Sequence, residues 1–284
     1  AKRVQSPTSI KTFKQCPRKY YYQYIEKLET KQSIHTVRGK IAHSVLEDFF
    51  DQNHAELSPD SVDMTLRTRV QQLFIKHWSE GRKELNELKL TQNEEMQYFE
   101  VTLLMLFNWL EAFLVKLHAE KTPLSETFKN LTPVREMEYR SEELAVRGFI
   151  DAIEHINGSV RIMDYKTNAN QELDDHKLQL AIYSLLYYER HNKLPDYAGI
   201  YFLRGDEKIM KVDLTFIEMA KQEIKSIHEK TESIAKQDYP MKITRLCNWG
   251  AGKCDFYELC FKPKDMQQIA AKTIPKESRL LSPH

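Results

Sequence analysis

The chain has 284 residues, enough for one large domain or for a core domain with an elaborated insert. Its 42 basic and 41 acidic residues give a net charge of +1, which excludes a protein held to nucleic acid by its overall charge. Because no stretch of about 18 uncharged apolar residues and no apolar signal region is found, we expect a soluble cytoplasmic or nucleoid-associated protein without a membrane partner.

The N-terminal segment predicts two short helices. Ser6 can cap the first helix with Pro7 at its first position, and Cys16-Pro17 ends it. Four tyrosines then follow among basic residues, and they serve either core packing or the stacking of bases; they are Tyr20, Tyr21, Tyr22 and Tyr24.

Residues 39–50 predict a third helix, whose face carries His43 and Glu47 at the i, i+4 spacing. Residues 61–90 and 92–120 predict two longer helices, with Thr91 as a cap. Charged and polar residues within 98–117 argue against a membrane span, so we expect a helical insert packed on the main body.

A hairpin is the most informative local pattern in the chain. Residues 134–140 alternate as a strand that carries Glu136 and Glu138 on one face, and we expect one of the two to approach the carboxylates of the hairpin. Asn157-Gly158 is typical of a type I′ turn and predicts strands at 144–156 and 159–166. Counting from that turn places Asp164 opposite Asp151, with Lys166 on the face of Asp164.

Two facing carboxylates repel each other unless something neutralises them. A divalent cation such as Mg²⁺ does so and leaves coordination positions open for water and phosphate. The alternative is a pair of solvated carboxylates, one of them bridged to Lys166. Both interpretations remain open at this level.

The chain after the hairpin alternates helix and strand. Residues 176–191 predict a helix that carries Gln179 and Tyr183 on one face. Residues 197–203 and 208–212 predict a second hairpin, and a long amphipathic helix runs from 213 or 215 to about 236. From Lys262 on the chain is polar, and we expect a poorly ordered terminus.

Three cysteines lie within 14 residues near the C-terminus, and a fourth lies near the N-terminus. Cysteines clustered in this way in a reducing compartment indicate metal ligation more often than disulfides. The set is Cys16, Cys247, Cys254 and Cys260.

Taken in order, these segments resemble the PD-(D/E)XK nuclease superfamily, in particular its RecB-like branch with an iron–sulfur cluster. That branch includes the nuclease domains of AddB-type helicase–nuclease subunits and the CRISPR-adaptation nucleases. Six segments carry the resemblance: the cysteine segment from Ser9 to Pro17, the histidine helix from Gly39 to Glu47, Gly148-Phe-Ile-Asp151, Asp164-Tyr-Lys166-Thr, Gln179-Leu-Ala-Ile-Tyr183 and the terminal cysteines.

The resemblance implies a role for each matching residue. His43, Asp151, Asp164 and the Tyr165 carbonyl would bind Mg²⁺ or Mn²⁺. Lys166 would orient or help deprotonate the attacking water and stabilise charge on the phosphate, and so act with Asp164 and Asp151 in catalysis. Gln179 and Tyr183 would position the DNA strand.

The same resemblance implies a 4Fe-4S cluster on Cys16, Cys247, Cys254 and Cys260, with structural Zn²⁺ as the alternative. Two features depart from the family. Its terminal cysteines often include a Cys-x-x-Cys pair, whereas six residues separate Cys247 from Cys254. In addition, Ile150 precedes Asp151 where the family name has proline, which is common in this branch.

The fold expected from the resemblance is α/β: a restriction-endonuclease-like, mixed central sheet of about five strands, flanked by helices. Residues 1–54 and 131–262 would form the nuclease domain, closed by the N/C-terminal cysteine cluster subdomain. Residues 55–130 would form the helical insert and residues 263–284 a C-terminal tail.

The function implied is a metal-dependent DNA nuclease, most simply an exonuclease on single-stranded DNA or DNA ends. It would act in repair, recombination or CRISPR- or phage-type DNA processing, with a helicase or another DNA-processing protein as its partner. Two alternatives stay open: a non-catalytic DNA-binding or scaffold subunit of a helicase–nuclease complex, and a structure-selective endonuclease.

Overall fold

The computed structural model describes residues 2–51, 57–169, 171–249 and 252–261. The chain divides into two compact units. The sheet unit comprises Arg3–Pro7 and Gln32–Lys225, and the cysteine unit comprises Ala1–Lys2, Thr8–Lys31 and Ser226–His284. The predicted tail, residues 263–284, lies outside the described residues. The division into a nuclease domain and a 55–130 insert stays a prediction.

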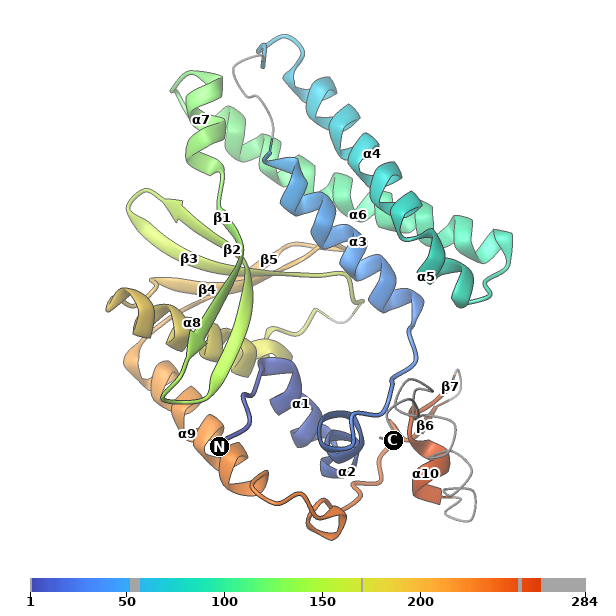
Figure 1. The fold of residues 1–284 in the computed structure, drawn as a ribbon. Helices are drawn as coiled ribbons and strands as arrows, with labels where there is room; N and C mark the ends of the chain where they lie inside the picture. The colour runs from blue at the N-terminus through green and yellow to red at the C-terminus, as the bar shows by residue number, and fades with distance from the viewer. Residues whose placement is uncertain (1, 52–56, 170, 250–251, 262–284) are drawn as a thin grey trace, which may run out of the picture. The chain divides into compact units, whose positions relative to one another are not determined.

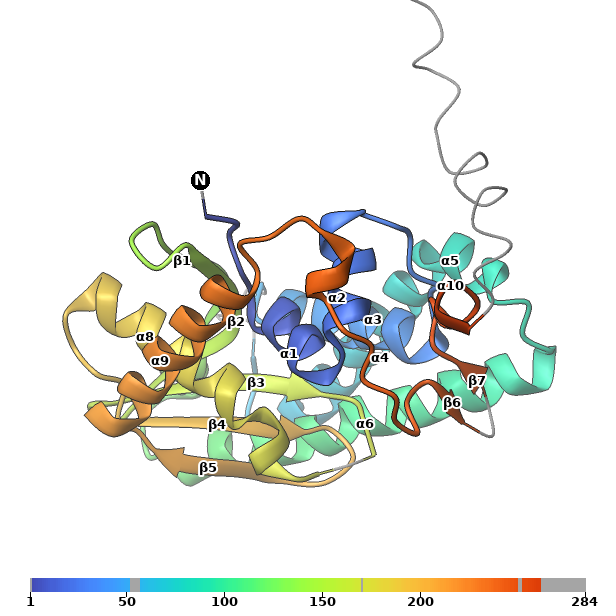
Figure 2. The ribbon, with the colours of Figure 1, turned by 90° about the horizontal axis from the view of Figure 1, so that it is seen from below.

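A mixed five-stranded sheet forms the centre of the sheet unit, in the order β1-β2-β3-β4-β5 (Figures 1 and 2). Neighbouring strands are antiparallel except for β3 and β4, which are parallel. This arrangement confirms the predicted α/β class and strand number. The strands are β1 (Val134–Ser141), β2 (Val146–Ile156), β3 (Ser159–Lys166), β4 (Tyr197–Phe202) and β5 (Glu207–Lys211).

The tight turn between β2 and β3 sets their register. Asn157 and Gly158 have φ values of 50° and 80°, as a type I′ turn requires. Pairing then runs from Ile156 with Ser159 to Ala152 with Met163, as the sequence predicts. The ladder ends at that pair, so Asp151 and Asp164 come directly after its last step instead of continuing it.

Helices flank the sheet. Helix α8 (Lys177–His191) contacts strands β1 to β4. On the helical side, α3 (Ile34–Phe49), α4 (Val62–Glu80) and α6 (Gln92–Ala119) share one buried apolar cluster with sheet residues such as Ala152 and Met163. Burial of this cluster is the main stabilising term of the unit. The remaining helical elements are α5 (Arg82–Glu87), α7 (Leu124–Leu131), η3 (Leu173–His176) and α9 (Leu214–Lys230), whose residues from Ser226 on belong to the cysteine unit.

Helix α6 begins where the sequence predicts. Thr91 and Glu94 form a reciprocal capping box at its N-terminus. By length and composition it is the one described helix that could cross a membrane, a test that core helices also pass. Its buried stripe, which includes Leu106, Leu110 and Phe113, lies in the cluster shared with the sheet.

Three predicted helix boundaries are wrong. Helix α3 begins at Ile34 instead of Gly39, because Ser33 caps it by accepting a hydrogen bond from the Thr36 amide. The predicted 61–90 helix is divided at Gly81. Helix α9 ends at Lys230, six residues before the predicted end at 236.

Short elements and aromatic rings build the cysteine unit. Tyr20, Tyr21 and Tyr22 are buried, and Tyr20 stacks on Tyr239 with ring centroids 6.1 Å apart. These three tyrosines therefore pack in the core, the first of the two predicted uses. The elements are α1 (Pro7–Gln15), α2 (Pro17–Tyr20), the π-helical η1 (Tyr21–Ile25), η4 (Lys236–Asp238), β6 (Asn248–Trp249), β7 (Gly252–Lys253) and α10 (Tyr257–Phe261).

Candidate metal centre and cysteine site

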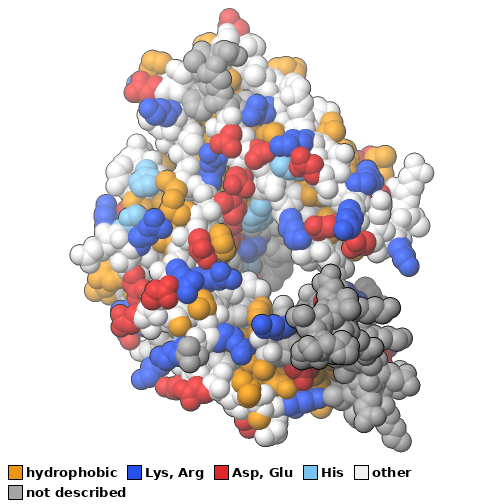
Figure 3. Space-filling view, viewed as in Figure 1, with side chains coloured by type: hydrophobic (Ala, Val, Ile, Leu, Met, Phe, Trp, Pro, Cys, Tyr) orange, Lys and Arg blue, Asp and Glu red, His pale blue; other side chains and the backbone are white. Residues whose placement is uncertain are grey.

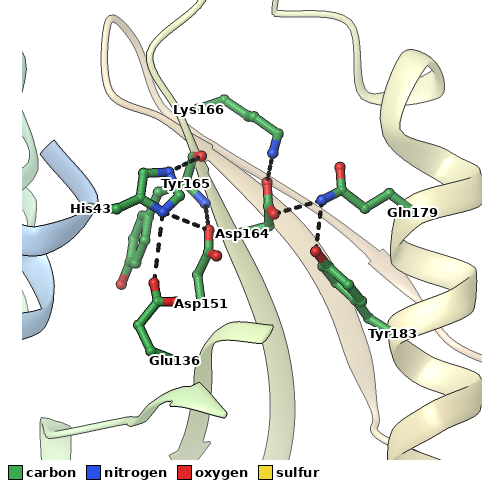
Figure 4. A network of polar contacts seen from close by, with 8 residues as sticks. All are labelled: His43, Glu136, Asp151, Asp164, Tyr165, Lys166, Gln179 and Tyr183. Atoms are coloured by element: carbon green, nitrogen blue, oxygen red, sulfur yellow. Dashed lines mark hydrogen bonds and ion pairs between the residues drawn. The ribbon is translucent and has the colours of Figure 1, made fainter. Parts of the chain in front are cut away.

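His43 points from α3 toward the end of the β2–β3 ladder (Figure 4). Its Nε2 lies 2.9 Å from the Tyr165 carbonyl oxygen. Its Nδ1 lies 3.4 Å from Asp151 Oδ2 and 3.8 Å from Glu136 Oε1. The imidazole thus has a carbonyl on one nitrogen and two carboxylates on the other.

Glu136 reaches this site through an unusual backbone conformation. The β1–β2 register places it opposite Asp151, between the pairs Arg135–Ala152 and Met137–Ile150. Its φ is 45°, a left-handed value that costs a residue with a Cβ of order 1 kcal/mol or more. Strain of this kind persists where the surrounding structure imposes it, and here it occurs beside His43.

Asp151 lies on β2, directly after the last residue that pairs with β3. Its Oδ2 accepts a hydrogen bond of 2.8 Å from the Tyr165 amide, so the carboxylate takes the place of a ladder partner. The side chain is 9% exposed. The ligand atoms of His43, Glu136 and Asp151 all lie within 4.8 Å of one another, the only such group of His, Cys, Asp or Glu side chains among the described residues.

Asp164 lies beside this group and has partners of its own. Its Oδ2 forms an ion pair of 2.5 Å with Lys166 Nζ. Its Oδ1 accepts a hydrogen bond of 2.8 Å from Gln179 Nε2, which also donates to the Tyr183 hydroxyl at 2.9 Å. Gln179 and Tyr183 come from α8, so one helix fixes the orientation of this carboxylate (Figure 4).

Gly148 is what allows Tyr183 to approach the sheet. A Cβ at this position would lie 2.7 Å from Cε1 and 3.1 Å from Cδ1 of the Tyr183 ring. Any other residue would therefore displace the ring that contacts Gln179. The Gly148-Phe-Ile-Asp151 segment thus provides both a carboxylate and the space for the neighbouring helix.

Three titratable groups of the site, Asp151, His43 and Lys166, have raised pKa values. Burial, and then the Asp164 carboxylate, raise the pKa of Asp151. Burial alone would lower the pKa of His43, but the Asp151 carboxylate and hydrogen bonds to Asp151 and Glu136 outweigh it and raise that pKa to about 10. At Lys166, burial lowers the pKa, but the carboxylates of Asp164 and Asp151 outweigh burial and raise it. Without a bound cation the site therefore holds protons on His43 and Lys166.

The donor set fits a hard divalent cation. Two carboxylates and one imidazole lie within 4.8 Å of one another, the Tyr165 carbonyl lies at the other imidazole nitrogen, and the charge of Asp164 raises the pKa of Asp151. A protonated His43 offsets part of that charge in the described structure. A cation supplies the same compensation and releases that proton.

The four cysteines surround a cavity of about 140 Å³ within the cysteine unit. Cys16 lies at the N-cap of α2, and the amide of Cys254 bonds to the Cys247 carbonyl at 3.0 Å. Burial, followed by the other three cysteines, raises the pKa of Cys260 to about 11. Among the described residues, no three of the cysteine sulfurs lie within 4.8 Å of one another.

The structure brings together every predicted residue of the sheet site, but in two adjoining groups. His43, Asp151 and the Tyr165 carbonyl form one, and Asp164, Lys166, Gln179 and Tyr183 form the other. Glu136, which the sequence offered only as one of two choices, joins the first group. Its position opposite Asp151 in the strand register was the signal that could have selected it.

The family model for the PD-(D/E)XK nuclease superfamily matches residues 5–261. The chain is 26% identical over 121 residues to the CRISPR-associated exonuclease Cas4 of Francisella tularensis subsp. novicida (strain U112), covering 43% of this chain and 59% of that protein. It is 39% identical over 66 residues to the Gene 69 protein of Mycobacterium phage L5, covering 23% and 22%.

The chain therefore spans less than two thirds of the length of either curated relative. A crystal structure titled "Putative exonuclease" from Eubacterium rectale aligns over 87% of this chain and 86% of that one, at 13% identity and a TM-score of 0.49. The family match covers both the sheet site and the four cysteines. On this ground, the chain belongs to the PD-(D/E)XK nuclease superfamily.

Proposed function

We propose that this chain is a Mg²⁺- or Mn²⁺-dependent deoxyribonuclease, acting as an exonuclease on single-stranded DNA or DNA ends. The observation that carries the proposal is the convergence of His43, Glu136 and Asp151 within 4.8 Å, beside the Asp164–Lys166 pair. The exonuclease named among the relatives supports the same choice. Metal-assisted phosphodiester hydrolysis uses such a set: carboxylates and an imidazole to bind the metal, and a lysine beside them to stabilise negative charge.

His43, Glu136, Asp151 and the Tyr165 carbonyl would hold the metal, with Asp164 as a further ligand. When bound, the ion supplies an activated water and neutralises charge on the phosphate. The chain contributes the fixed positions of these donors: the Tyr165 amide holds Asp151, and α3 directs His43 onto the Tyr165 carbonyl. Fixed donors cost little reorganisation when substrate binds.

Lys166 would act as a fixed positive charge. Its raised pKa keeps Nζ protonated at neutral pH, so it suits donation of a hydrogen bond to a phosphate oxygen better than abstraction of a proton. The side chain is 24% exposed and lines a cavity, and Asp164 pairs with its Nζ.

Gln179 and Tyr183 would hold the Asp164 carboxylate in its orientation. Gln179 bonds directly to that carboxylate, and Tyr183 is only 6% exposed. They are positioning residues in this proposal, and their predicted contact with the DNA strand remains a further expectation.

The cysteine unit would carry a 4Fe-4S cluster in place of zinc. Tetrahedral zinc with Zn–S bonds near 2.3 Å draws four sulfurs to about 3.8 Å from one another. The sulfurs here are not gathered to that degree among the described residues, and they line a cavity. A cluster of four irons between the thiolates fits such a wider arrangement. Its role would be structural, joining the two ends of the chain.

The proposal is tested with end-labelled DNA. Anaerobically purified protein is incubated with single-stranded, double-stranded and circular DNA in Mg²⁺, Mn²⁺ or EDTA, alongside the Lys166→Met variant. We expect metal-dependent shortening from an end, loss of cleavage in EDTA and in Lys166→Met, and an unchanged circular dichroism spectrum. Cleavage of circular DNA would indicate the endonuclease alternative, and full activity in Lys166→Met would contradict the site.

Binding of DNA without any cleavage by the loaded protein would instead indicate the scaffold alternative. All candidate ligands and Lys166 are present, which favours an active enzyme. A helicase or another DNA-processing protein remains the proposed partner, and repair, recombination or CRISPR- or phage-type processing the proposed setting.

A further inference from the structure

A cavity of about 610 Å³ in the sheet unit adjoins the candidate metal centre. His43, Tyr165 and Lys166 belong to both, so a molecule that fills the cavity also reaches the metal site. Beyond them, the cavity is lined by the N-terminal turn of α3, the segment after β3 and Arg204 of the β4–β5 turn. Arg204 is brought there because the Leu203 amide bonds to the Lys166 carbonyl at 2.9 Å.

The charged side chains that line this cavity are all basic. Arg38, Lys166 and Arg204 line it together with two histidines, and none of its described lining residues is acidic. By contrast, acidic and basic side chains are interspersed over the face of the molecule drawn in Figure 3. The cavity is therefore a local concentration of positive charge in a chain of nearly neutral overall charge.

Arg38 is the decisive residue. It is 2% exposed, and only its Nη2 has a hydrogen bond, 3.1 Å to the Thr167 carbonyl. Its Nε and Nη1 are buried without a hydrogen-bond partner among the described residues. The guanidinium also faces the Tyr98 ring at 5.6 Å, which does not satisfy these N–H groups.

Arg161 differs from Arg38 in having carboxylate partners, although its Nε also lacks a hydrogen bond among the described residues. Arg161 is also largely buried, but it bonds to Glu207 at 2.6 Å and lies 3.4 Å from Glu154. A buried charge is ordinarily paired in this way, because burial removes its hydration and an unpaired charge then destabilises the fold. No carboxylate of the described residues pairs with Arg38, and burial and Arg204 both lower its pKa. Its arrangement suits an anion that arrives from outside the chain.

The start of α3 adds to this preference. The helix has 16 residues, no acidic residue in its first turn, and His35 and Thr36 on the cavity wall. Amide groups and the helix dipole favour an anion at such an end. Two arginines with forked N–H groups and a helix N-terminus form a site typical of phosphate recognition.

We propose that Arg38, Arg204 and the first turn of α3 form a subsite for a phosphate group of the DNA strand, next to the bond that is cleaved. The inference rests on the proposed nuclease function for the identity of the anion. The phosphate is either a 5′-terminal monoester or an internal phosphodiester of the bound strand. The subsite thereby holds the strand in register with the metal centre.

The test measures DNA binding with Ca²⁺ in place of Mg²⁺, and a gel checks that the DNA stays intact. Three single-stranded probes are compared by fluorescence anisotropy or competition: 5′-phosphorylated, 5′-hydroxyl and circular. The variants are Arg38→Met and Arg204→Gln. Lys40→Gln is the matched control, since Lys40 lies on the same helix, carries the same charge and pairs with Glu84 at 3.1 Å on the surface.

We expect each arginine variant to bind about tenfold to a hundredfold more weakly, the effect of losing a charge-assisted contact. The slope of log K against log salt should fall by about 0.7 per lost phosphate contact, with Lys40→Gln within about twofold of the wild type. Weakening confined to the 5′-phosphorylated probe identifies a terminal phosphate. Equal weakening on all three identifies an internal one.

Arg38→Met should also melt at the same temperature as the wild type or higher, because it removes an unpaired buried charge. A lower melting temperature with unchanged binding would make Arg38 structural, and Arg204→Gln, at an exposed residue, tests the subsite independently of folding. Wild-type affinity in both variants overturns the proposal even if the protein cuts DNA. Arginine-dependent binding without cleavage in Mg²⁺ or Mn²⁺ overturns the nuclease function and leaves the subsite standing.

Discussion

The sheet site and the cysteine site differ in what holds their side chains in place. In the sheet site, each acidic or basic group contacts another at 2.5 to 3.8 Å, and strands and helices fix all of them. The cysteines border a cavity, and their sulfurs do not form a tight group among the described residues. The first site is organised by the chain itself, whereas we expect the second to depend on the group that it binds.

The largest expected effect is the loss of cleavage in Asp164→Asn. The amide keeps the size of the side chain but carries no charge, so it can neither form the ion pair with the Lys166 ammonium nor serve the metal as a carboxylate. We expect cleavage to fall by at least about a hundredfold, with little change in melting temperature. Asp174→Asn, at an exposed acid before α8, is the control and should cut at the wild-type rate. Equal rates in the two variants would rule out the assigned role.

Cys260→Ser should show the opposite pattern. Because the bound cluster would hold the cysteine unit together, we expect lost visible absorption and iron, together with a lower melting temperature. The sheet unit should keep its Mn²⁺ site. Calorimetry and an iron assay on the variant measure both effects. Wild-type stability with the iron absent would show that the cysteine unit is organised without a ligand.

Gly148→Ala tests how closely the sheet site is packed. The added methyl group would lie 2.7 Å from the Tyr183 ring, so Tyr183 and then Gln179 must move. We expect a loss of about 1–3 kcal/mol in unfolding free energy and a drop in cleavage rate beyond the change in stability. Gly39→Ala is the control, since its methyl group meets only Thr167 Oγ1 at 3.6 Å. A fully active Gly148→Ala variant would show that the Tyr183 position is not needed.

Removal of the Gln179 hydrogen bonds should have a smaller effect. Gln179→Leu leaves Asp164 bound only to Lys166, and we expect Mn²⁺ affinity to fall by about tenfold to a hundredfold, as for other residues that orient a metal ligand. Tyr183→Phe, which keeps the ring and loses the hydroxyl, should weaken binding less. Titration of Mn²⁺ without DNA measures both. If Gln179→Leu impaired DNA binding alone, its role would be strand contact.

The last effect concerns pH. Since His43 has a pKa of about 10 in the metal-free site, it is protonated below that value and must release a proton when the cation binds. Apparent Mn²⁺ affinity should therefore rise as pH increases, by up to about tenfold per unit between roughly pH 6.5 and 8.5. A His43→Gln variant should lose this dependence. Affinity that does not change with pH would place the cation elsewhere.

Much of the sheet unit is predictable from the sequence because short-range rules determine it. Asn157-Gly158 fixes the β2–β3 register, and the i, i+4 spacing places Gln179 with Tyr183. The left-handed backbone of Glu136, and the bond from the Tyr165 amide to Asp151 at the end of the β2–β3 pairing, depend instead on β1, β2, β3 and α3 together. No local pattern encodes such a combination.

Arg38 and Arg204 escaped prediction for a similar reason. The predicted helix began at Gly39, after Arg38, although Ser33 is a residue that commonly caps a helix. Arg204 lies in a turn 166 positions further along the chain, and only the pairing of β4 with β3 brings it to the cavity. Charge that is gathered by topology leaves no trace in a net charge of +1.

In our proposal, one cation held by His43, Glu136 and Asp151, together with Asp164, is required for cleavage. It is tested most directly by measuring bound Mn²⁺ by electron paramagnetic resonance and cleavage of end-labelled single-stranded DNA in the same samples, for the wild type and Asp151→Asn. We predict that cleavage rises in step with Mn²⁺ occupancy in the wild type and that both are lost in the variant. Cleavage at the wild-type rate in EDTA, or in Asp151→Asn without bound Mn²⁺, would contradict the claim.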